Sequence, residues 1–268
     1  MTSSLVPDYE VKVLLKPTEV LASSNRLKDA VQSEFDIMPG TKKMNIQFVD
    51  TEKKAIYTSG WNLRIRKTEG KKYFELTYKK RYPVKEGYYC TAEGNINTAL
   101  ETALQEGFNS ATTYGAQVEV GYQEQTLSIS YDAKLPDEGF EGMDLPDPKD
   151  SRKFLTEKAP KEFKNWSSED WGTQHLANSI VYGPVHAKRF EGIWDGFKLF
   201  IEVWPIRKSK TDESLELIVE ASFKTPDLKK ALEGRARLIK SLQKRAWILD
   251  KDSLKTKLIM ERYGTSNE

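Results

Sequence analysis

Apolar and polar side chains alternate along much of this chain. In residues 8–16, Val11 and Val13 share one face of an extended segment. Glu10 and Lys12 share the opposite face. A period of two residues is typical of a β-strand with one buried face. The same pattern predicts further strands at residues 43–50, 61–67, 72–80, 88–95, 117–122, 126–132, 185–194, 197–204 and 213–223.

Helical spacing of apolar residues appears between these groups of strands. One helical stretch begins at Pro17 and ends before Pro39-Gly40, and a weaker one covers residues 98–106. A long amphipathic helix follows the capping sequence at residues 225–227 and ends near Gln243. The strands therefore outnumber the helices, and the helices are clustered along the chain.

Residues 135–180 differ from the rest. Residues 135–150 are rich in Pro, Gly and Asp, which is typical of a surface loop, and residues 151–180 have a helical pattern. We expect a single domain over residues 1–268 with an insertion at about 135–180. Trp166 and Trp171 of this insertion could form an exposed patch for a protein partner or pack against the domain, and packing is the more common outcome.

The second face of the predicted strands is charged. Arg64 and Arg66 alternate with apolar residues in one strand, and Lys79 occupies the same phase in the next. A one-sided sheet that exposes its charged face to water would explain any single strand. However, the helices are too few to cover several separate sheets. We therefore predict an α+β fold in which a closed antiparallel barrel buries its apolar face under helices and gathers the charges inside.

A charged interior predicts a charged ligand, because buried charges need partners. Arg and Lys side chains match phosphate oxygens, and Asp and Glu bind Mg²⁺ or Mn²⁺. A barrel lined by both favours a small, highly phosphorylated partner together with a divalent cation.

The composition narrows the class of protein. The 42 basic and 40 acidic residues leave a net charge of +2, which does not indicate a nucleic-acid-binding face. The lone Cys90 favours a reducing compartment, and no apolar run is long enough to span a membrane. His175 and His186 lack the spacing of metal ligands. We expect a soluble cytoplasmic protein that binds neither membrane nor nucleic acid.

Several motifs, in order, resemble those of the CYTH or triphosphate tunnel superfamily. Residues 8–12 (DYEVK) resemble its N-terminal ExExK signature, and residues 63–66 (LRIR) and 75–79 (ELTYK) are similar to its R-x-R and L-T-x-K strand pair. The same order is followed by residues 48–51, by Glu93, by residues 188–190, 195–196 and 216–220, and by the terminal Lys257. The likeness covers most of the chain outside the insertion and suggests a divergent member, of fungal or other eukaryotic type.

This resemblance implies an eight-stranded tunnel that hydrolyses triphosphates or, in some members, cyclises ATP. Mg²⁺ or Mn²⁺ would polarise the terminal phosphoryl group. The implied phosphate-binding residues are Lys12, Arg64, Arg66, Lys79, Arg189 and Lys257. The implied metal-binding residues are Asp8, Glu10, Glu93, Glu216 and Glu220. The implied catalytic residues are Glu10, Lys12, Arg64 and Arg66.

Two positions depart from the family pattern. Trp204 and Ile218 stand where the family has metal-binding carboxylates, and Glu202 could partly substitute for them. Together with Phe200, these residues could contact the apolar part of an organic diphosphate such as a prenyl diphosphate, or they could simply pack in the core. The departures also keep open a non-catalytic module that binds polyphosphate or a nucleotide.

Overall fold

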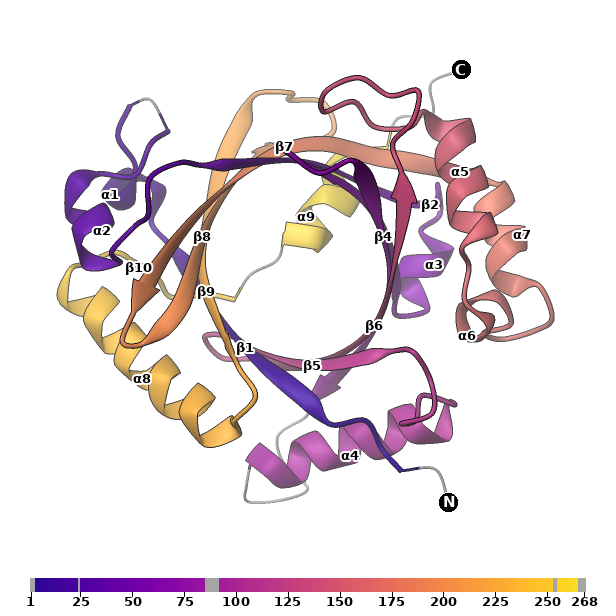
Figure 1. The fold of residues 1–268 in the computed structure, drawn as a ribbon, viewed down its shortest axis with the longest axis horizontal. Helices are drawn as coiled ribbons and strands as arrows, with labels where there is room; N and C mark the ends of the chain where they lie inside the picture. Colours follow the sequence, from indigo (N-terminus) through magenta and orange to yellow (C-terminus); the bar gives the residue numbers. More distant parts are fainter. Residues whose placement is uncertain (1–2, 24, 85–91, 253–254, 265–268) are drawn as a thin grey trace.

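Ten strands form one sheet that closes on itself (Figure 1). The computed structural model describes residues 3–23, 25–84, 92–252 and 255–264. The strand order is β10-β1-β5-β6-β4-β3-β2-β7-β8-β9, and β1 also pairs with β9. The strands are β1 (Pro7–Leu15), β2 (Lys42–Thr51), β3 (Trp61–Thr68), β4 (Tyr73–Val84), β5 (Gly115–Val120), β6 (Gln125–Pro136), β7 (Ser179–Trp194), β8 (Phe197–Arg207), β9 (Leu215–Thr225) and β10 (Ile248–Leu249).

Strand β1 closes the barrel. It pairs antiparallel with β9, from Tyr9 opposite Thr225 to Leu15 opposite Val219, and parallel with β5 on its other side. The closed ring has nine strands, with β10 outside it, where the family resemblance led us to expect eight. Closure leaves the described strands of the ring paired on both sides, which removes the exposed edges that an open sheet would carry.

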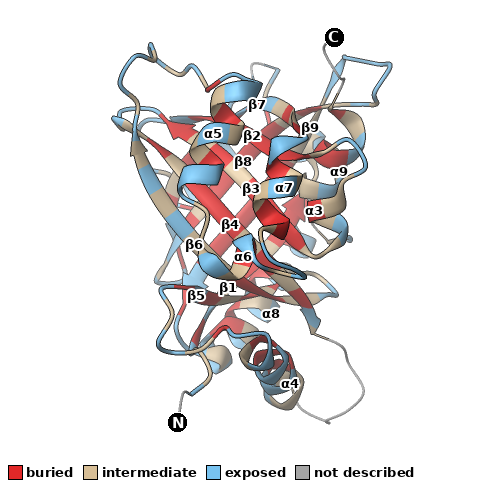
Figure 2. Ribbon diagram, turned by 90° about the vertical axis from the view of Figure 1, so that its right-hand side faces the viewer, coloured by how far each residue is buried: buried red, intermediate tan, exposed pale blue. Residues whose placement is uncertain are grey.

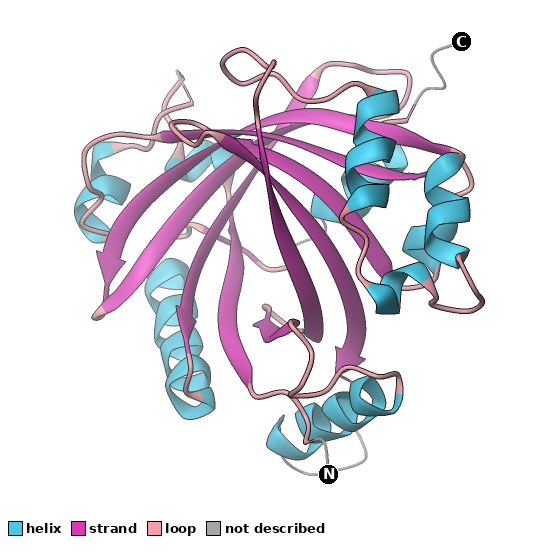
Figure 3. Ribbon diagram, turned by 45° about the vertical axis from the view of Figure 1, so that its right-hand side comes forward, coloured by secondary structure: helices cyan, strands magenta, loops and turns pink. Residues whose placement is uncertain are grey.

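The described helices lie mainly outside this ring (Figures 1 and 3). In Figure 1, α8 and α4 flank the lower half of the barrel, α5 to α7 lie on its right, and α9 appears within the ring. The helices are α1 (Pro17–Val20), α2 (Asp29–Glu34), α3 (Ala55–Thr58), α4 (Ala92–Gln105), α5 (Pro148–Glu157), α6 (Lys161–Lys164), α7 (Trp171–Ala177), α8 (Leu228–Lys244) and α9 (Lys255–Arg262).

The main hydrophobic core lies between the outer face of the barrel and these helices (Figure 2). Leu63 and Leu76 on the outward face of β3 and β4 are 1% and 0% exposed. Trp61 lies 5.2 Å from Phe163 and 5.5 Å from Trp166, measured between ring centroids. The tryptophans of residues 151–180 therefore pack against the barrel and do not form an exposed aromatic patch.

Several boundaries differ from the sequence predictions for local reasons. The predicted helix after Pro17 is two short helices, α1 and α2, separated by a bridge between Leu21 and Leu27. Strand β7 starts at Ser179, well before the predicted start, because it continues through Pro184 at an irregularity in its pairing with β2. Of the predicted strand at 88–95, residues 88–91 lie outside the described residues and the rest begin α4.

No helix in the described part of the chain combines the length and the apolar character that crossing a membrane requires.

Truncating an outward-facing core leucine is expected to destabilise the barrel. Leu76→Ala removes a fully buried side chain from β4, and we expect a loss of about 2–5 kcal/mol in the free energy of unfolding. Leu215→Ala is the matched control, because Leu215 is 56% exposed and should change stability by less than about 0.5 kcal/mol. Urea unfolding measures both, and equal losses would contradict burial of this face.

Candidate polyanion site inside the barrel

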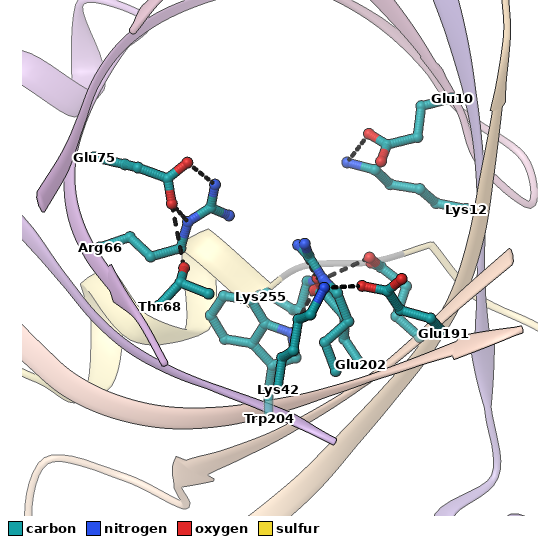
Figure 4. Close-up of polar contacts among 12 residues, drawn as sticks. Glu10, Lys12, Lys42, Arg66, Thr68, Glu75, Glu191, Glu202, Trp204 and Lys255 are labelled. Carbon is teal, nitrogen blue, oxygen red and sulfur yellow. Dashed lines mark hydrogen bonds and ion pairs between the residues drawn. The ribbon is translucent and has the colours of Figure 1, made fainter. Parts of the chain in front are cut away.

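The strand register decides which side chains point into the barrel. Residues directly opposite each other on neighbouring strands share a face of the sheet. Arg64 is paired with Thr77 and Arg66 with Glu75 between β3 and β4, and Glu10 is paired with Glu119 between β1 and β5. The predicted gathering of charges inside a closed barrel is therefore present, and Figure 4 shows several of these side chains projecting from opposite walls.

Two lysines and two glutamates form one cluster on β1, β4 and β5. Lys12 Nζ lies 3.0 Å from Glu10 Oε2 and 3.2 Å from Glu119 Oε2, and Lys79 Nζ lies 3.1 Å from Glu119 Oε1. Burial opposes the charge on Lys12, but the two carboxylates outweigh it and raise the pKa of its ammonium. Lys79 differs: burial, together with Arg81, Lys12 and Arg64, outweighs Glu119 and lowers its pKa to about 8.

Arg66 is held by a two-pronged ion pair on the opposite wall. Its Nε donates to Glu75 Oε2 at 3.0 Å and its Nη2 donates to Glu75 Oε1 at 3.2 Å. Lys71 Nζ lies 3.2 Å from the same carboxylate, and Thr68 Oγ1 donates to it. Burial would raise the pKa of Glu75, but Arg66 and Lys71 lower it to about 2.

Arg64 has no ion pair with a carboxylate among the described residues. Its Nη2 donates to the neutral hydroxyl of Thr77 at 3.0 Å, and that hydroxyl donates to Asp132. Its Nε is buried without a hydrogen-bond partner among the described residues. Burial, followed by the charge of Arg66, lowers its pKa to about 10. A partly buried guanidinium with an unused donor fits an anion from outside the chain.

A third cluster joins β7, β8, β9 and α9. Arg189 donates to Glu202 Oε1 through Nε at 2.9 Å and Nη2 at 2.6 Å. Lys255 Nζ lies 3.2 Å from Glu202 Oε2 and 2.8 Å from Glu220 Oε1. Burial would raise the pKa of Glu202, but Lys255 and Arg189 hold it well below its ordinary value.

Another part of the interior is apolar and packs against α9. Trp204 belongs to a second hydrophobic cluster with residues of β2 and β7 and with Ile259 and Met260 of α9, and Ile218 packs against it. This arrangement favours the core-packing interpretation of Trp204 and Ile218 over contact with a substrate. Phe200 is placed differently, because its ring lies 5.1 Å from the guanidinium carbon of Arg189.

Several predicted site residues lie away from these clusters. Glu93 is exposed in the first turn of α4, outside the ring, because its segment is helical. Lys257 has a side chain that is 55% exposed and lies 4.0 Å from Glu261 on its own helix. Asp8 shares the inward phase of Glu10 but is exposed near the start of β1. Glu216 is paired with Arg262 at 2.6 Å.

Other interior residues were not among the predicted site residues. Glu75 and Thr77 lie on the same face of β4 as Lys79, and Glu119 lies on the same face of β5 as Gln117. The alternation of side chains along these strands could therefore have identified Glu75, Thr77 and Glu119. Asp132 lies opposite Thr77 on β6 and follows from the register once β4 and β6 are paired. Lys255 lies at the start of α9 and not in a strand, so no alternation of apolar and polar residues indicates its position inside the barrel.

The donors inside the barrel do not fit a resident Mg²⁺ or Mn²⁺ in this arrangement. Among the described residues, no group of three or more His, Cys, Asp or Glu side chains is placed to hold a metal ion. Glu10, Glu75, Glu119, Glu202 and Glu220 each contact an ammonium or guanidinium group instead.

Comparison with solved structures identifies the fold. A putative adenylyl cyclase from Hippeastrum, described as having a dominant triphosphatase activity, matches with a TM-score of 0.53 and 12% identity over 93% of each chain. A putative adenylate cyclase from Bacillus halodurans matches with a TM-score of 0.48 and 12% identity over 96% of this chain and 98% of its own. No family model and no curated protein matches the sequence. The first match confirms the predicted barrel fold. Membership of the CYTH superfamily, and its fungal or other eukaryotic type, stay predictions.

The Arg66–Glu75 pair predicts a defined loss of stability in acid. Because the pKa of Glu75 is lowered to about 2 in the folded protein, its contribution is present above the ordinary value near 4.5 and is lost as the pH falls toward 2. Between pH 6 and pH 3, wild-type protein should lose on the order of 2 kcal/mol more stability than Glu75→Gln. Chemical unfolding at both pH values measures this difference.

The control for this measurement is Glu69→Gln, because Glu69 has a 44% exposed side chain and a surface ion pair at 3.5 Å. It should follow the wild-type pH profile. If Glu75→Gln also follows that profile, the ion pair does not stabilise the folded state.

Proposed function

We propose that this protein binds the polyphosphate group of a small phosphorylated substrate inside the barrel and hydrolyses one of its phosphoanhydride bonds. The observation that carries the proposal is Arg64, a partly buried guanidinium whose buried Nε has no partner among the described residues. The fold of the Hippeastrum protein, which is described as having a dominant triphosphatase activity, supports the same class of substrate.

Several basic side chains would bind the phosphate groups together. Arg64 offers unused donors, and Lys12, Arg66 and Lys79 face the same interior from β1, β3 and β4. Guanidinium groups suit two oxygens of one phosphate, and ammonium groups act as point charges. These cations would offset the negative charge that spreads over the phosphoryl oxygens during transfer.

Glu10 is our candidate for positioning the attacking water. Its Oε2 is engaged by Lys12 at 3.0 Å and by Gln117, whereas the nearest ion-pair partner of its Oε1 is Lys224 at 3.9 Å. One oxygen is thus fixed in place and the other is free to accept a hydrogen bond from water. Lys12 and Lys224 lower the pKa of Glu10 against the effect of burial, so the carboxylate is charged at neutral pH.

The divalent cation expected from the family resemblance stays a prediction. Because the carboxylates inside the barrel are already paired with cationic side chains, we place Mg²⁺ or Mn²⁺ on the phosphates of the substrate as it enters. Magnesium is commonly held by substrate phosphates with only one or two protein carboxylates.

A second candidate is a non-catalytic module that binds polyphosphate or a nucleotide. The pairing of Glu119, Glu202 and Glu220 with cations favours it, since these pairs leave fewer carboxylates available for catalysis. An organic diphosphate with an apolar tail remains a further substrate option, supported by Phe200 beside Arg189. A screen of tripolyphosphate, nucleoside triphosphates, thiamine triphosphate and organic diphosphates, with Mg²⁺ or Mn²⁺, separates turnover from binding by measuring release of phosphate or diphosphate.

Arg64→Ala tests the anion site directly. Removing the guanidinium should weaken binding of tripolyphosphate by roughly 10- to 100-fold, because a hydrogen bond to a charged group contributes about 1.5–3 kcal/mol. Isothermal titration calorimetry measures the affinity. Arg237→Ala is the matched control, because Arg237 has a 51% exposed side chain on α8 outside the ring.

The same variants separate binding from hydrolysis. Glu10→Gln should still bind tripolyphosphate. It should lose most of the hydrolytic activity toward any compound of the screen that the wild-type protein hydrolyses. Unchanged affinity in Arg64→Ala would contradict the location of the site, and full turnover in Glu10→Gln would contradict the role of Glu10. Binding without turnover of any compound would favour the non-catalytic module.

Lys79 predicts how phosphate binding depends on pH. Its ammonium must be charged to attract phosphate, and its pKa of about 8 means that the charge is lost as the pH rises through that value. Between pH 7 and pH 9 the affinity of wild-type protein for tripolyphosphate should fall by up to about tenfold relative to Lys79→Arg. Calorimetry on both proteins measures the ratio, which cancels the titration of the ligand, and a constant ratio would refute the prediction.

A further inference from the structure

Two buried glutamates face each other inside the barrel. Glu202 on β8 is directly opposite Glu220 on β9, and the two residues are 8% and 3% exposed. Like charges directly opposite each other on neighbouring strands are destabilising. Buried carboxylates also need a compensating cation. This pair therefore requires positive charge from another part of the chain or from a bound ion.

Lys255 of α9 supplies that charge. Its Nζ lies 2.8 Å from Glu220 Oε1 and 3.2 Å from Glu202 Oε2, so one ammonium bridges both carboxylates. It also lies 4.4 Å from the centroid of the Trp204 ring, and Trp204 Nε1 donates to Glu202 Oε2 at 2.8 Å. Figure 4 shows Lys255, Trp204 and Glu202 gathered on the same wall of the barrel.

We propose that the ammonium of Lys255 takes the place of a resident divalent cation between Glu202 and Glu220. Two carboxylates facing each other across a strand pair are protein ligands that Mg²⁺ commonly uses. Here the bridging position is filled by a side chain. Trp204 stands where the family resemblance places a further metal-binding carboxylate. Its N–H group can donate to a carboxylate, and the face of its ring can contact an ammonium group.

The formal charges of the paired groups at this position cancel without a metal, although Glu220 Oε2 is buried without a hydrogen-bond partner among the described residues. Glu202 and Glu220 contribute two negative charges, and Arg189 and Lys255 contribute two positive charges. A divalent cation entering the same position would have to displace the ammonium from both carboxylates. The apolar contacts of Ile259 and Met260 inside the barrel hold α9, and with it Lys255, in place.

This inference deepens the proposed function and rests on it for its consequence: the protein's own side chains neutralise this part of the site, so any catalytic Mg²⁺ or Mn²⁺ arrives with the substrate. The metal-binding step itself can be tested without a substrate. Failure to hydrolyse any phosphate compound would therefore leave the result of that test unaffected.

The test is a titration with Mn²⁺ in the absence of phosphate compounds, followed by electron paramagnetic resonance of free Mn²⁺. Wild-type protein and Glu220→Gln should bind the same amount of Mn²⁺, because Lys255 already occupies the position between the two carboxylates. Lys255→Met removes the ammonium and keeps a long side chain against Trp204, so it should gain one Mn²⁺ site that the double variant Lys255→Met/Glu220→Gln lacks. Mn²⁺ should also raise the Tm of Lys255→Met and not that of wild type.

The matched control is Lys257→Met, because Lys257 lies on the same helix with an exposed side chain, and this variant should behave as wild type. If Lys255→Met does not fold, Lys255→Gln keeps a polar side chain without the charge and is measured in the same way. Binding of Mn²⁺ by wild-type protein that Glu220→Gln abolishes would overturn the proposal. So would a folded Lys255→Met that binds no Mn²⁺.

Discussion

The enclosed interior of the barrel imposes one constraint on everything inside it, namely that each buried charge needs a partner. Lys12 is bridged to Glu10 and Glu119, Arg66 is held by Glu75, and Glu202 is held by Arg189. Arg64 departs from this rule, because its hydrogen bond goes to a neutral hydroxyl and its Nε is buried without a described partner. Because this cation is incompletely compensated, an external anion is expected to bind beside it.

Burial of the outward apolar face offsets the free-energy cost of the charged interior. Burying charge costs free energy, whereas the helices that cover Leu63 and Leu76 remove apolar surface from water and stabilise the closed ring. The division between the two faces follows from the two-residue period of a strand. Closure through β1 then turns one face of the sheet into an interior.

Much of this arrangement could be predicted from the sequence, because alternation within a strand determines which residues share a face. Lys12, Arg64 and Lys79 were placed inside on that basis, and the register confirms it. Segments in which apolar and polar residues do not alternate clearly were predicted less well. β10 has two residues, too few for a pattern, and β7 continues past Pro184, which normally marks the end of a strand.

The C-terminal helix shows the limit of a sequence prediction most clearly. Lys257 was expected to hold phosphate, whereas Lys255 is the lysine that reaches the interior carboxylates. Two residues apart on an α-helix project about 200° apart, so a displacement of two positions moves the side chain to the opposite side of the helix. No periodicity in so short a segment determines which side faces the barrel; packing against Trp204 and its neighbours does.

A crystal structure of the protein with tripolyphosphate bound would test the central claim most directly. The account predicts phosphate density inside the ring of strands, with an oxygen within hydrogen-bond distance of the Arg64 guanidinium. Density confined to the exposed basic side chains of α8 or to another surface outside the ring, with the Arg64 Nε still unpartnered, would contradict it.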